Sequence, residues 1–441
     1  MQRNPHSYQI ATGYRTFYSL SLIYQPITKK QLFFKEKLIE SMKQWHLFCL
    51  LPLMAACDSG HSGSGELISV DLRQGIDHPS MLNLQDEVES VEYIPLETTD
   101  DPASLLDGVS EYALTSKYIY VSPVKEQRIV QFDRKGHFIK TLIPFGQGPG
   151  EFSNFLAGIQ ADEENNRLYL FSANQIGVYT LEGEFIQNLN HDYQIVYQRK
   201  VEQDCFASVA FPYIPFRSGS YGLGIFTEQG DTIAVKNDFT SPLVPPEKAG
   251  FTIGIAATYS GKQQSLLFKT GCNDTVFRIS DHKIMPACVL NLQNSDQEII
   301  RCLDATDFSS LHQKFGGNKD IFVSDLFETP RSYYFRCRYD GGHYVVSVDK
   351  ETGKILAEQC EQPEDIFKLS DANLLFGMLG TRSYRSFPVW GRMEKDGLVQ
   401  VVIPYELSLY EKGSTLTVPD ELKKINVDSN PIFIVYKLRE G

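Results

Sequence analysis

The stretch from Arg128 to Phe152, RIVQFDRKGHFIKTLIPFGQGPGEF, contains the pattern from which the fold can be predicted. Its runs 129–132 and 137–142 are rich in β-branched and aromatic residues, and the DRKG between them ends in a glycine that tolerates a positive φ. These features predict an antiparallel hairpin. In the FGQGPGEF that follows, three glycines and a proline stand close together, so neither a strand nor a helix can continue there. The chain therefore changes direction after the hairpin.

The same hairpin turn recurs at equal spacing along the chain. Its glycines, Gly136, Gly183 and Gly230, are 47 residues apart each time. Each turn belongs to a unit of four strand-like runs, and the units continue as far as a fifth, whose turn lies at 351–353. A period of about 40 to 50 residues with four strands per unit is typical of a β-propeller, whose blades pack around a central channel.

A sixth unit, at 384–403 and 431–438, lacks one of its four strands. The segment Val88–Leu96 alternates as a strand does, precedes the first unit and belongs to none. Pairing of this segment with Pro431–Leu438 would complete the sixth blade and remove the open sheet edges. The sequence therefore predicts an all-β protein, a six-bladed β-propeller over 86–441 that is closed by its N- and C-terminal strands and carries a few short helical insertions, near 295–315, 405–412 and 419–425.

Residues Met42–Cys57, MKQWHLFCLLPLMAAC, have the form of a secretion signal, with a basic Lys43, an apolar run and then small residues. The apolar run is too short to span a bilayer as a helix. Its end, MAAC, resembles a bacterial lipobox, in which the cysteine, here Cys57, is acylated and becomes the first mature residue. We expect a start-site extension at 1–41, a signal peptide at 42–56 and a lipidated flexible tether at 57–85. A short buried segment around Cys57 and a cytoplasmic tail at 1–41 are the alternatives.

Several motifs in this order resemble one family. They are the lipobox, the VEYIPLE strand, the FGQGPGEF crossing, the strand Asn273–Ile279 and the terminal Asn430–Leu438. Together they resemble the six-bladed, NHL-like β-propeller lipoproteins of Bacteroidetes, over Asp86 to Arg439. The resemblance implies a protein of the cell envelope, lipid-anchored to the outer membrane on its periplasmic or cell-surface side.

The charge of the chain excludes one class of partner. Seven of the 42 Lys and Arg and two of the 55 Asp and Glu precede Cys57, which leaves 35 basic and 53 acidic residues and a net charge of −18. Such an acidic chain repels nucleic-acid backbones and anionic lipid headgroups. Nucleic acid is therefore not an expected partner, and we expect contact with the membrane through the lipid anchor only.

The sequence offers little support for catalysis or for a cofactor. The six cysteines after Cys57 include no C-x-x-C pair, which favours buried free thiols and leaves a disulfide as the alternative. The histidines are scattered without an H-E-x-x-H spacing, and 162–166 lacks the pattern of an EF-hand. No G-x-S-x-G elbow is present, and FGQGPGEF lacks the lysine and the following helix of a phosphate loop. We expect no metal and no cofactor.

Two segments rich in aromatic residues, 211–222 and 384–392, are interrupted by proline and glycine and are expected to form loops. Exposed aromatic rings beside arginine are typical of a binding face, whereas packing in the core is the alternative for each. The expected ligand contacts are Tyr213, Phe216, Arg217, Tyr221, Tyr384, Arg385 and Trp390. In a six-bladed ring these groups stand opposite each other and could share a ligand only over the channel.

The function predicted from these features is that of a monomeric envelope scaffold that binds a glycan, a peptide or a partner protein through one face of the propeller. The alternative is a propeller enzyme, a lyase or hydrolase with its site at the mouth of the channel.

Overall fold

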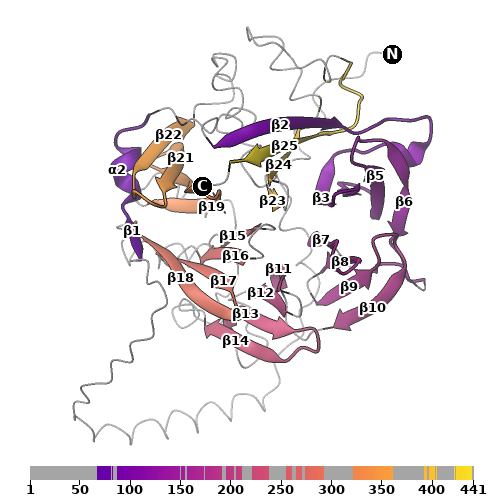
Figure 1. The fold of residues 1–441 in the computed structure, drawn as a ribbon, viewed down its shortest axis with the longest axis horizontal. Coiled ribbons are helices and arrows are strands. Elements are labelled where there is room, and N and C mark those ends of the chain that lie inside the picture. The colour runs from indigo at the N-terminus through magenta and orange to yellow at the C-terminus, as the bar shows by residue number, and fades with distance from the viewer. Residues whose placement is uncertain are drawn as a thin grey trace, which may run out of the picture. The chain divides into compact units, whose positions relative to one another are not determined.

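Six blades, each with four antiparallel strands, follow one another around the ring in Figure 1, as the sequence predicts. In blades 1 to 5 the innermost strand comes first in the chain and each strand pairs with the next one outward, whereas the outermost strand of blade 6, β2, comes from the N-terminal part of the chain. In blades 1 to 3, from the inside outward, the strands are β3 (Val109–Leu114), β4 (Tyr118–Pro123), β5 (Arg128–Asp133) and β6 (Phe138–Pro144); β7 (Gly158–Asp162), β8 (Arg167–Phe171), β9 (Gln175–Tyr179) and β10 (Phe185–Asn190); and β11 (Ile195–Glu202), β12 (Cys205–Ala210), β13 (Tyr221–Thr227) and β14 (Thr232–Asn237).

Blades 4 to 6 continue the same plan. Their strands are β15 (Ile255–Ser260), β16 (Ser265–Thr270), β17 (Thr275–Ser280) and β18 (Lys283–Leu290); β19 (Phe322–Glu328), β20 (Ser332–Tyr339), β21 (Gly342–Asp349) and β22 (Ile355–Cys360); and β23 (Arg392–Glu394), β24 (Gly397–Val402), β25 (Ile432–Leu438) and β2 (Val88–Pro95). A single parallel pair, Ser260 with Met393, joins β15 to β23 at the centre of the ring.

This computed structural model describes 67–80, 82, 87–148, 150–153, 156–172, 174–190, 195–202, 205–210, 221–237, 255–260, 265–270, 274–292, 321–360, 392–394, 397–402, 404, 422 and 424–439. The predicted signal, start-site extension and lipidated Cys57 lie outside these residues. So do the helical insertions expected at 295–315 and 405–412 and most of the one at 419–425. Within the described part, no helix has the length and apolar character to cross a membrane.

The predicted closure of the ring is confirmed. Strand β2 pairs antiparallel with β25, with Tyr93 opposite Ile434, and supplies the fourth strand of blade 6. Asn430, just before β25, fixes the junction with blade 1: its side-chain amide accepts from Leu106 N (2.8 Å) and donates to Glu97 O and Ser104 O (2.7 Å each). Asn430 is fully buried, so these hydrogen bonds satisfy groups that water cannot reach.

The repeated turn has the conformation that its glycine predicts. Gly136, Gly183 and Gly230 have φ values of 88°, 92° and 88°, which L-amino acids rarely adopt. In each turn the glycine N–H donates to the carbonyl of the residue three positions earlier. The equal spacing in the sequence therefore reflects the same hairpin in three successive blades.

The FGQGPGEF crossing between blades 1 and 2 is closed by its own glutamate. Gly148 N–H donates to Glu151 Oε2 (2.8 Å), and a Cβ on Gly146 would lie 2.0 Å from the same oxygen. The carboxylate of Glu151 thus occupies the space that the glycines leave open. An internal anion in this position supports the interpretation of the loop as a crossing rather than as a phosphate site.

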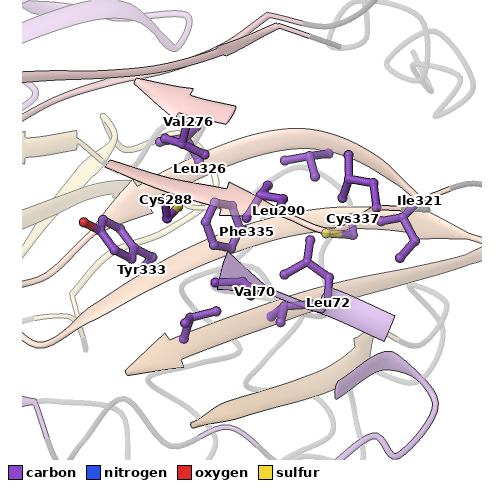
Figure 2. Close-up of a cluster of buried hydrophobic side chains, with 14 of the residues drawn as sticks. Val70, Leu72, Val276, Cys288, Leu290, Ile321, Leu326, Tyr333, Phe335 and Cys337 are labelled. Atoms are coloured by element: carbon purple, nitrogen blue, oxygen red, sulfur yellow. The ribbon is translucent and has the colours of Figure 1, made fainter. Parts of the chain in front are cut away.

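The prediction of a flexible tether over 57–85 is wrong for residues 68–76. Strand β1 (Ile68–Val70) pairs in parallel with β18, adding a fifth strand to blade 4, and the helix α2 (Leu72–Ile76) packs against blade 5. Val70 and Leu72 are buried among side chains of both blades (Figure 2). The apolar residues at 68, 70, 72 and 76 explain why the segment is held, because leaving them exposed to water would be unfavourable.

Candidate functional site

Most of the predicted ligand contacts lie outside the described residues. This applies to Tyr213, Phe216, Arg217, Tyr384, Arg385 and Trp390. Tyr221 is the first residue of β13, pairs with Asn237 and adjoins a register shift in the ladder. Its role in binding stays a prediction.

A different arginine lies at the inner edge of the ring. Arg199, in the innermost strand β11 of blade 3, is 3% exposed. Its guanidinium carbon lies 4.3 Å from the centre of the Tyr197 ring and 5.6 Å from that of Phe171 in blade 2. Its Nη2 is 3.8 Å from Glu111 Oε2, in the innermost strand of blade 1. One side chain therefore lies beside residues of blades 1, 2 and 3.

A glycine makes room for this guanidinium. A Cβ on Gly158, at the start of β7, would lie 2.3 Å from Arg199 Nη1. Any other residue at this position would push the guanidinium away. The position of Arg199 therefore depends on the absence of a side chain at Gly158 in the neighbouring blade.

The guanidinium of Arg199 is incompletely hydrogen-bonded. Nη1 donates to Gln198 O (2.7 Å), while Nε, though buried, has no hydrogen-bond partner, and the 3.8 Å between Nη2 and Glu111 exceeds a hydrogen-bond distance. The neighbouring Gln198 Oε1 and Ser208 Oγ are also buried without partners. Gln198 and Ser208 are opposite each other in the β11–β12 ladder, so these two side chains share one face of the sheet, while Arg199 is opposite Ala207. Buried polar groups of this kind are normally satisfied by ordered water or by a ligand.

The inner strands of blades 2 and 3 are held in register beside this site. The Gln160 side chain accepts from Lys200 N and donates to Lys200 O, at 2.8 Å each, as a neighbouring strand would. Lys200 Nζ, in turn, lies 3.2 Å from Asp162 Oδ2. Since these groups satisfy one another, they position the strands that carry Arg199 and Gly158. Unlike Lys200, which is paired with Asp162, Arg199 keeps an N–H donor, Nε, without an acceptor.

A second buried charged cluster, between blades 4 and 5, is structural. Glu328 accepts from Arg278 through both oxygens (2.8 and 2.7 Å) and from Lys350 Nζ (2.9 Å). Burial raises the pKa of Glu328, but the hydrogen bonds and charges of Arg278 and Lys350 outweigh it and hold the pKa below its usual value. The two cations share the one carboxylate, and each has a further acceptor: Arg278 Nη1 donates to Ser265 Oγ (3.1 Å) and Lys350 Nζ to Thr329 O (2.6 Å). The cluster therefore joins two blades through hydrogen bonds that its own members satisfy.

Sequence reasoning did not identify Arg199. The signal that could have suggested it is the run Gln198, Arg199, Lys200 inside an otherwise strand-like segment, since three polar residues in succession are unusual for a strand buried between blades. The partners Gly158 and Glu111 lie 41 and 88 residues earlier, and only the packing of the blades brings them together.

Cys205, Cys288 and Cys337 are buried thiols, which confirms the expectation for these three. Burial raises the pKa of Cys288 to about 12, so this thiol stays protonated and unreactive at neutral pH.

Comparison with known proteins agrees with the fold. A family model described as "Domain of unknown function (DUF4934)" matches residues 67–437. The chain is similar to a presumed exported protein of Bacteroides fragilis, with 15% identity and a TM-score of 0.63 over 85% of this chain and 100% of that chain. It is also similar to a member of the DUF4221 family from Bacteroides vulgatus, with 12% identity and a TM-score of 0.46 over 80% of this chain and 98% of that chain. No curated protein matches the sequence.

Proposed function

Since the chain belongs to the DUF4934 family and folds as a six-bladed β-propeller, we propose that it is a binding module of the bacterial cell envelope. Its ligand is a glycan, a peptide or a partner protein that carries an anionic group, and the inner edge of blades 1 to 3 holds that group. The finer resemblance, to the NHL-like lipoproteins of Bacteroidetes, belongs to the same proposal.

The observation that carries this proposal is the buried guanidinium of Arg199. A buried charged donor without an acceptor is unfavourable by about 1–3 kcal/mol or more. A carboxylate or sulfate of a ligand would accept from Nε and Nη2 together, in the bidentate geometry that guanidinium favours. The partly exposed Tyr197 ring beside it adds apolar surface for the body of the ligand.

The charges around Arg199 limit the net charge of the ligand. In a chain with a net charge of −13, a ligand that is acidic overall is repelled by most of the surface. Arg199 offers one local cation, and the half-buried Glu111 beside it disfavours a second anionic group. We therefore expect a ligand with a single anionic group on a mostly neutral body.

Binding explains the site better than catalysis does. General acid–base catalysis needs ionisable side chains that point at the substrate and are free to exchange a proton with it. Among the residues that the structure describes at this edge, Lys200 is paired with Asp162, and the Gln160 amide, which does not ionise, is bonded to the backbone of Lys200. The arrangement suits recognition of a fixed anion, with Arg199 positioned by its neighbours.

The experiment is a titration of the purified chain with oligosaccharides that carry one carboxylate or sulfate, their neutral counterparts, and peptides with and without an acidic residue. Arg199→Gln should weaken binding of the acidic ligand roughly 10- to 150-fold, because a charged hydrogen bond contributes about 1.5–3 kcal/mol. Gly158→Ala should also weaken it, since the new methyl group displaces the guanidinium while the charge remains.

The matched control is Arg331→Gln, which removes the same charge from an exposed arginine of blade 5. This variant should bind as the unaltered chain does. Equal affinities for Arg199→Gln and the unaltered chain, or equal binding of acidic and neutral ligands, would contradict the site.

The cellular address is a separate part of the proposal. It is supported by the signal-like segment 42–56 and by the similarity in fold to a presumed exported protein. Acylation of Cys57 would anchor the propeller to the outer membrane. Cys57→Ala should therefore move the protein from the membrane to the soluble fraction and remove its acyl label; an acylated, membrane-bound variant would disprove the anchor.

The predicted contacts at 211–222 and 384–392 belong to the proposal as the outer part of the binding face. Ala substitution of Tyr221 or Trp390 should weaken binding without a large change in the melting temperature. A large loss of stability would assign these residues to the core.

A further inference from the structure

A second group of side chains, independent of Arg199, meets where blade 3 faces blade 4. It consists of Glu202 at the end of β11, Cys205 at the start of β12 and His282 in the turn between β17 and β18. The carboxylate oxygen, the thiol sulfur and the imidazole nitrogen all lie within 4.8 Å of one another. Among the residues that the structure describes, this is the one group of three or more such side chains that meets this distance.

The register of the sheet brings two of the three together. Glu202 and Cys205 are directly opposite each other in the β11–β12 ladder, so their side chains project on the same face. Cys205 is fully buried in the apolar cluster between blades 3 and 4, whereas Glu202 is partly exposed. The thiol therefore lies at the floor of the group and the carboxylate nearer to solvent.

The turn of blade 4 supplies the third side chain. His282 has a φ of 57°, a left-handed conformation that is uncommon for residues other than glycine. Its backbone N–H donates to Glu202 Oε1 and its Nδ1 lies 2.9 Å from Glu202 Oε2. The carboxylate thus fixes both the turn and the ring of His282, with the imidazole directed at blade 3.

We propose that Glu202, Cys205 and His282 bind a zinc ion that links blades 3 and 4. Thiolate, imidazole and carboxylate are the ligands that Zn²⁺ takes in proteins, at about 2.0–2.3 Å, and a thiolate disfavours Ca²⁺ and Mg²⁺. The three ligand atoms are close enough for one ion to sit between them after small side-chain rotations. The direct contact between His282 and Glu202 would then be replaced by two bonds to the metal.

Binding at this site would be coupled to a proton. Cys205 must give its thiol proton to solvent, and His282 must be neutral, so affinity should fall as the pH is lowered. Three protein ligands leave the fourth tetrahedral position to water. Because the ligands come from two blades, the bound ion would also stabilise their junction.

The test is a titration of the purified, metal-free full chain with Co²⁺, followed by displacement with Zn²⁺. Thiolate ligation gives a charge-transfer absorption that other ligands do not give, and Zn²⁺ should abolish it at one equivalent. Cys205→Ser should remove the absorption. His282→Asn and Glu202→Gln should weaken binding at least 10-fold; asparagine tolerates the positive φ at 282, so this variant should keep its fold.

The chain offers two matched controls. His137 makes the same 2.9 Å contact, with Asp133, in the hairpin of blade 1, so His137→Asn removes a histidine from a comparable pair. Cys337→Ser removes another buried thiol. Both variants should bind Co²⁺ as the unaltered chain does. The proposal is overturned if the unaltered chain gives no charge-transfer absorption, or if His282→Asn retains full affinity.

Discussion

The N-terminal segment joins the ring at two places, and the two junctions are built differently. Between blades 6 and 1, β2 fills a vacancy, because blade 6 has only three strands without it. Between blades 4 and 5, β1 and α2 add to blades that are already complete. We call residues 67–77 the staple. The ring needs β2 to complete blade 6, whereas the staple only reinforces blades that are complete without it.

The chemistry of the two junctions also differs. The junction of blades 6 and 1 has an apolar core and the buried, neutral Asn430, and its ion pair between Arg134 and Glu92 in β2 involves a partly exposed carboxylate. The junction of blades 4 and 5 contains the charged cluster around Glu328, with Tyr333 between the cluster and the apolar residues that cover Leu72. Protonation of Glu328 would leave two partly buried cations, Arg278 and Lys350, without their carboxylate, so this junction should be the more sensitive to pH.

The largest effect is expected from removing β2. Deletion of residues 58–97 takes away both the staple and β2 and exposes the edge of β25, so the ring should lose cooperative unfolding altogether. Deletion of 58–80 removes the staple alone and should leave a cooperative transition at a lower melting temperature. Thermal unfolding by circular dichroism distinguishes them. Cooperative melting of the longer deletion at the temperature of the full chain would disprove closure by β2.

The same contrast shows what the sequence could predict. A strand-like Val88–Leu96 with no unit of its own, and a sixth unit short of one strand, together determine the closure. No such pattern in the sequence predicts β1, because blade 4 lacks no strand and the segment follows a run of serine and glycine. The position of the staple is determined by apolar packing against blades 4 and 5, and the periodicity of the sequence does not reveal such contacts between blades.

The site follows the same rule. The glycine turns were predictable because a positive φ is a local requirement. The position of Arg199 was not predictable, since it depends on the space that Gly158 leaves in another blade. Recognition residues in a propeller arise from contacts between units, and the repeat pattern describes only the units themselves.

A smaller but still large effect is expected at the charged junction. Glu328→Gln should lower the free energy of unfolding by up to about 3–5 kcal/mol, because the partly buried Arg278 and Lys350 lose their counter-charge. Chemical denaturation at pH 7 measures this loss. Lys350→Gln in the Glu328→Gln background should cost little more, since the interaction has already gone.

The pH dependence gives the same junction a second test. The folded pKa of Glu328 lies below its usual value of 4.5, so its contribution is complete above that pH and is lost as the pH falls through the folded pKa. The stability difference between the unaltered chain and Glu328→Gln should therefore stay constant above about pH 5.5 and shrink below pH 4.5. A difference that does not change on acidification would contradict the ionised role of Glu328.

The staple should respond locally. Leu72→Ala opens a cavity at a fully buried position and should cost about 2–3 kcal/mol at most, because the staple can detach while blades 4 and 5 keep four strands each. Hydrogen exchange should accelerate in residues 67–77 and remain slow in β24 and β25. Val427→Ala, at an exposed apolar position, is the control and should change neither.

The smallest effect concerns how closely β2 packs against the hairpin of blade 1. Gly136 and Gly230 share a φ of 88°, so alanine pays the same conformational penalty at both, about 1–2 kcal/mol. They differ in surroundings: a Cβ on Gly136 would lie 2.2 Å from Pro95 O in β2, whereas a Cβ on Gly230 meets nothing within 4 Å. Gly136→Ala must therefore push β2 away from blade 1, at a further cost of about 1–2 kcal/mol.

The difference between these two alanine variants, measured by denaturant unfolding, isolates the contact with β2 from the strain of the turn. The hydrogen bond from Glu97 N to Gly136 O (2.8 Å) lies at the same point, so exchange of the Glu97 amide should accelerate in Gly136→Ala alone. Equal destabilisation by both variants would show that β2 yields at no cost. The closing strand would then be loosely held at Pro95, and the integrity of the ring would depend on Asn430 and the ladder with β25.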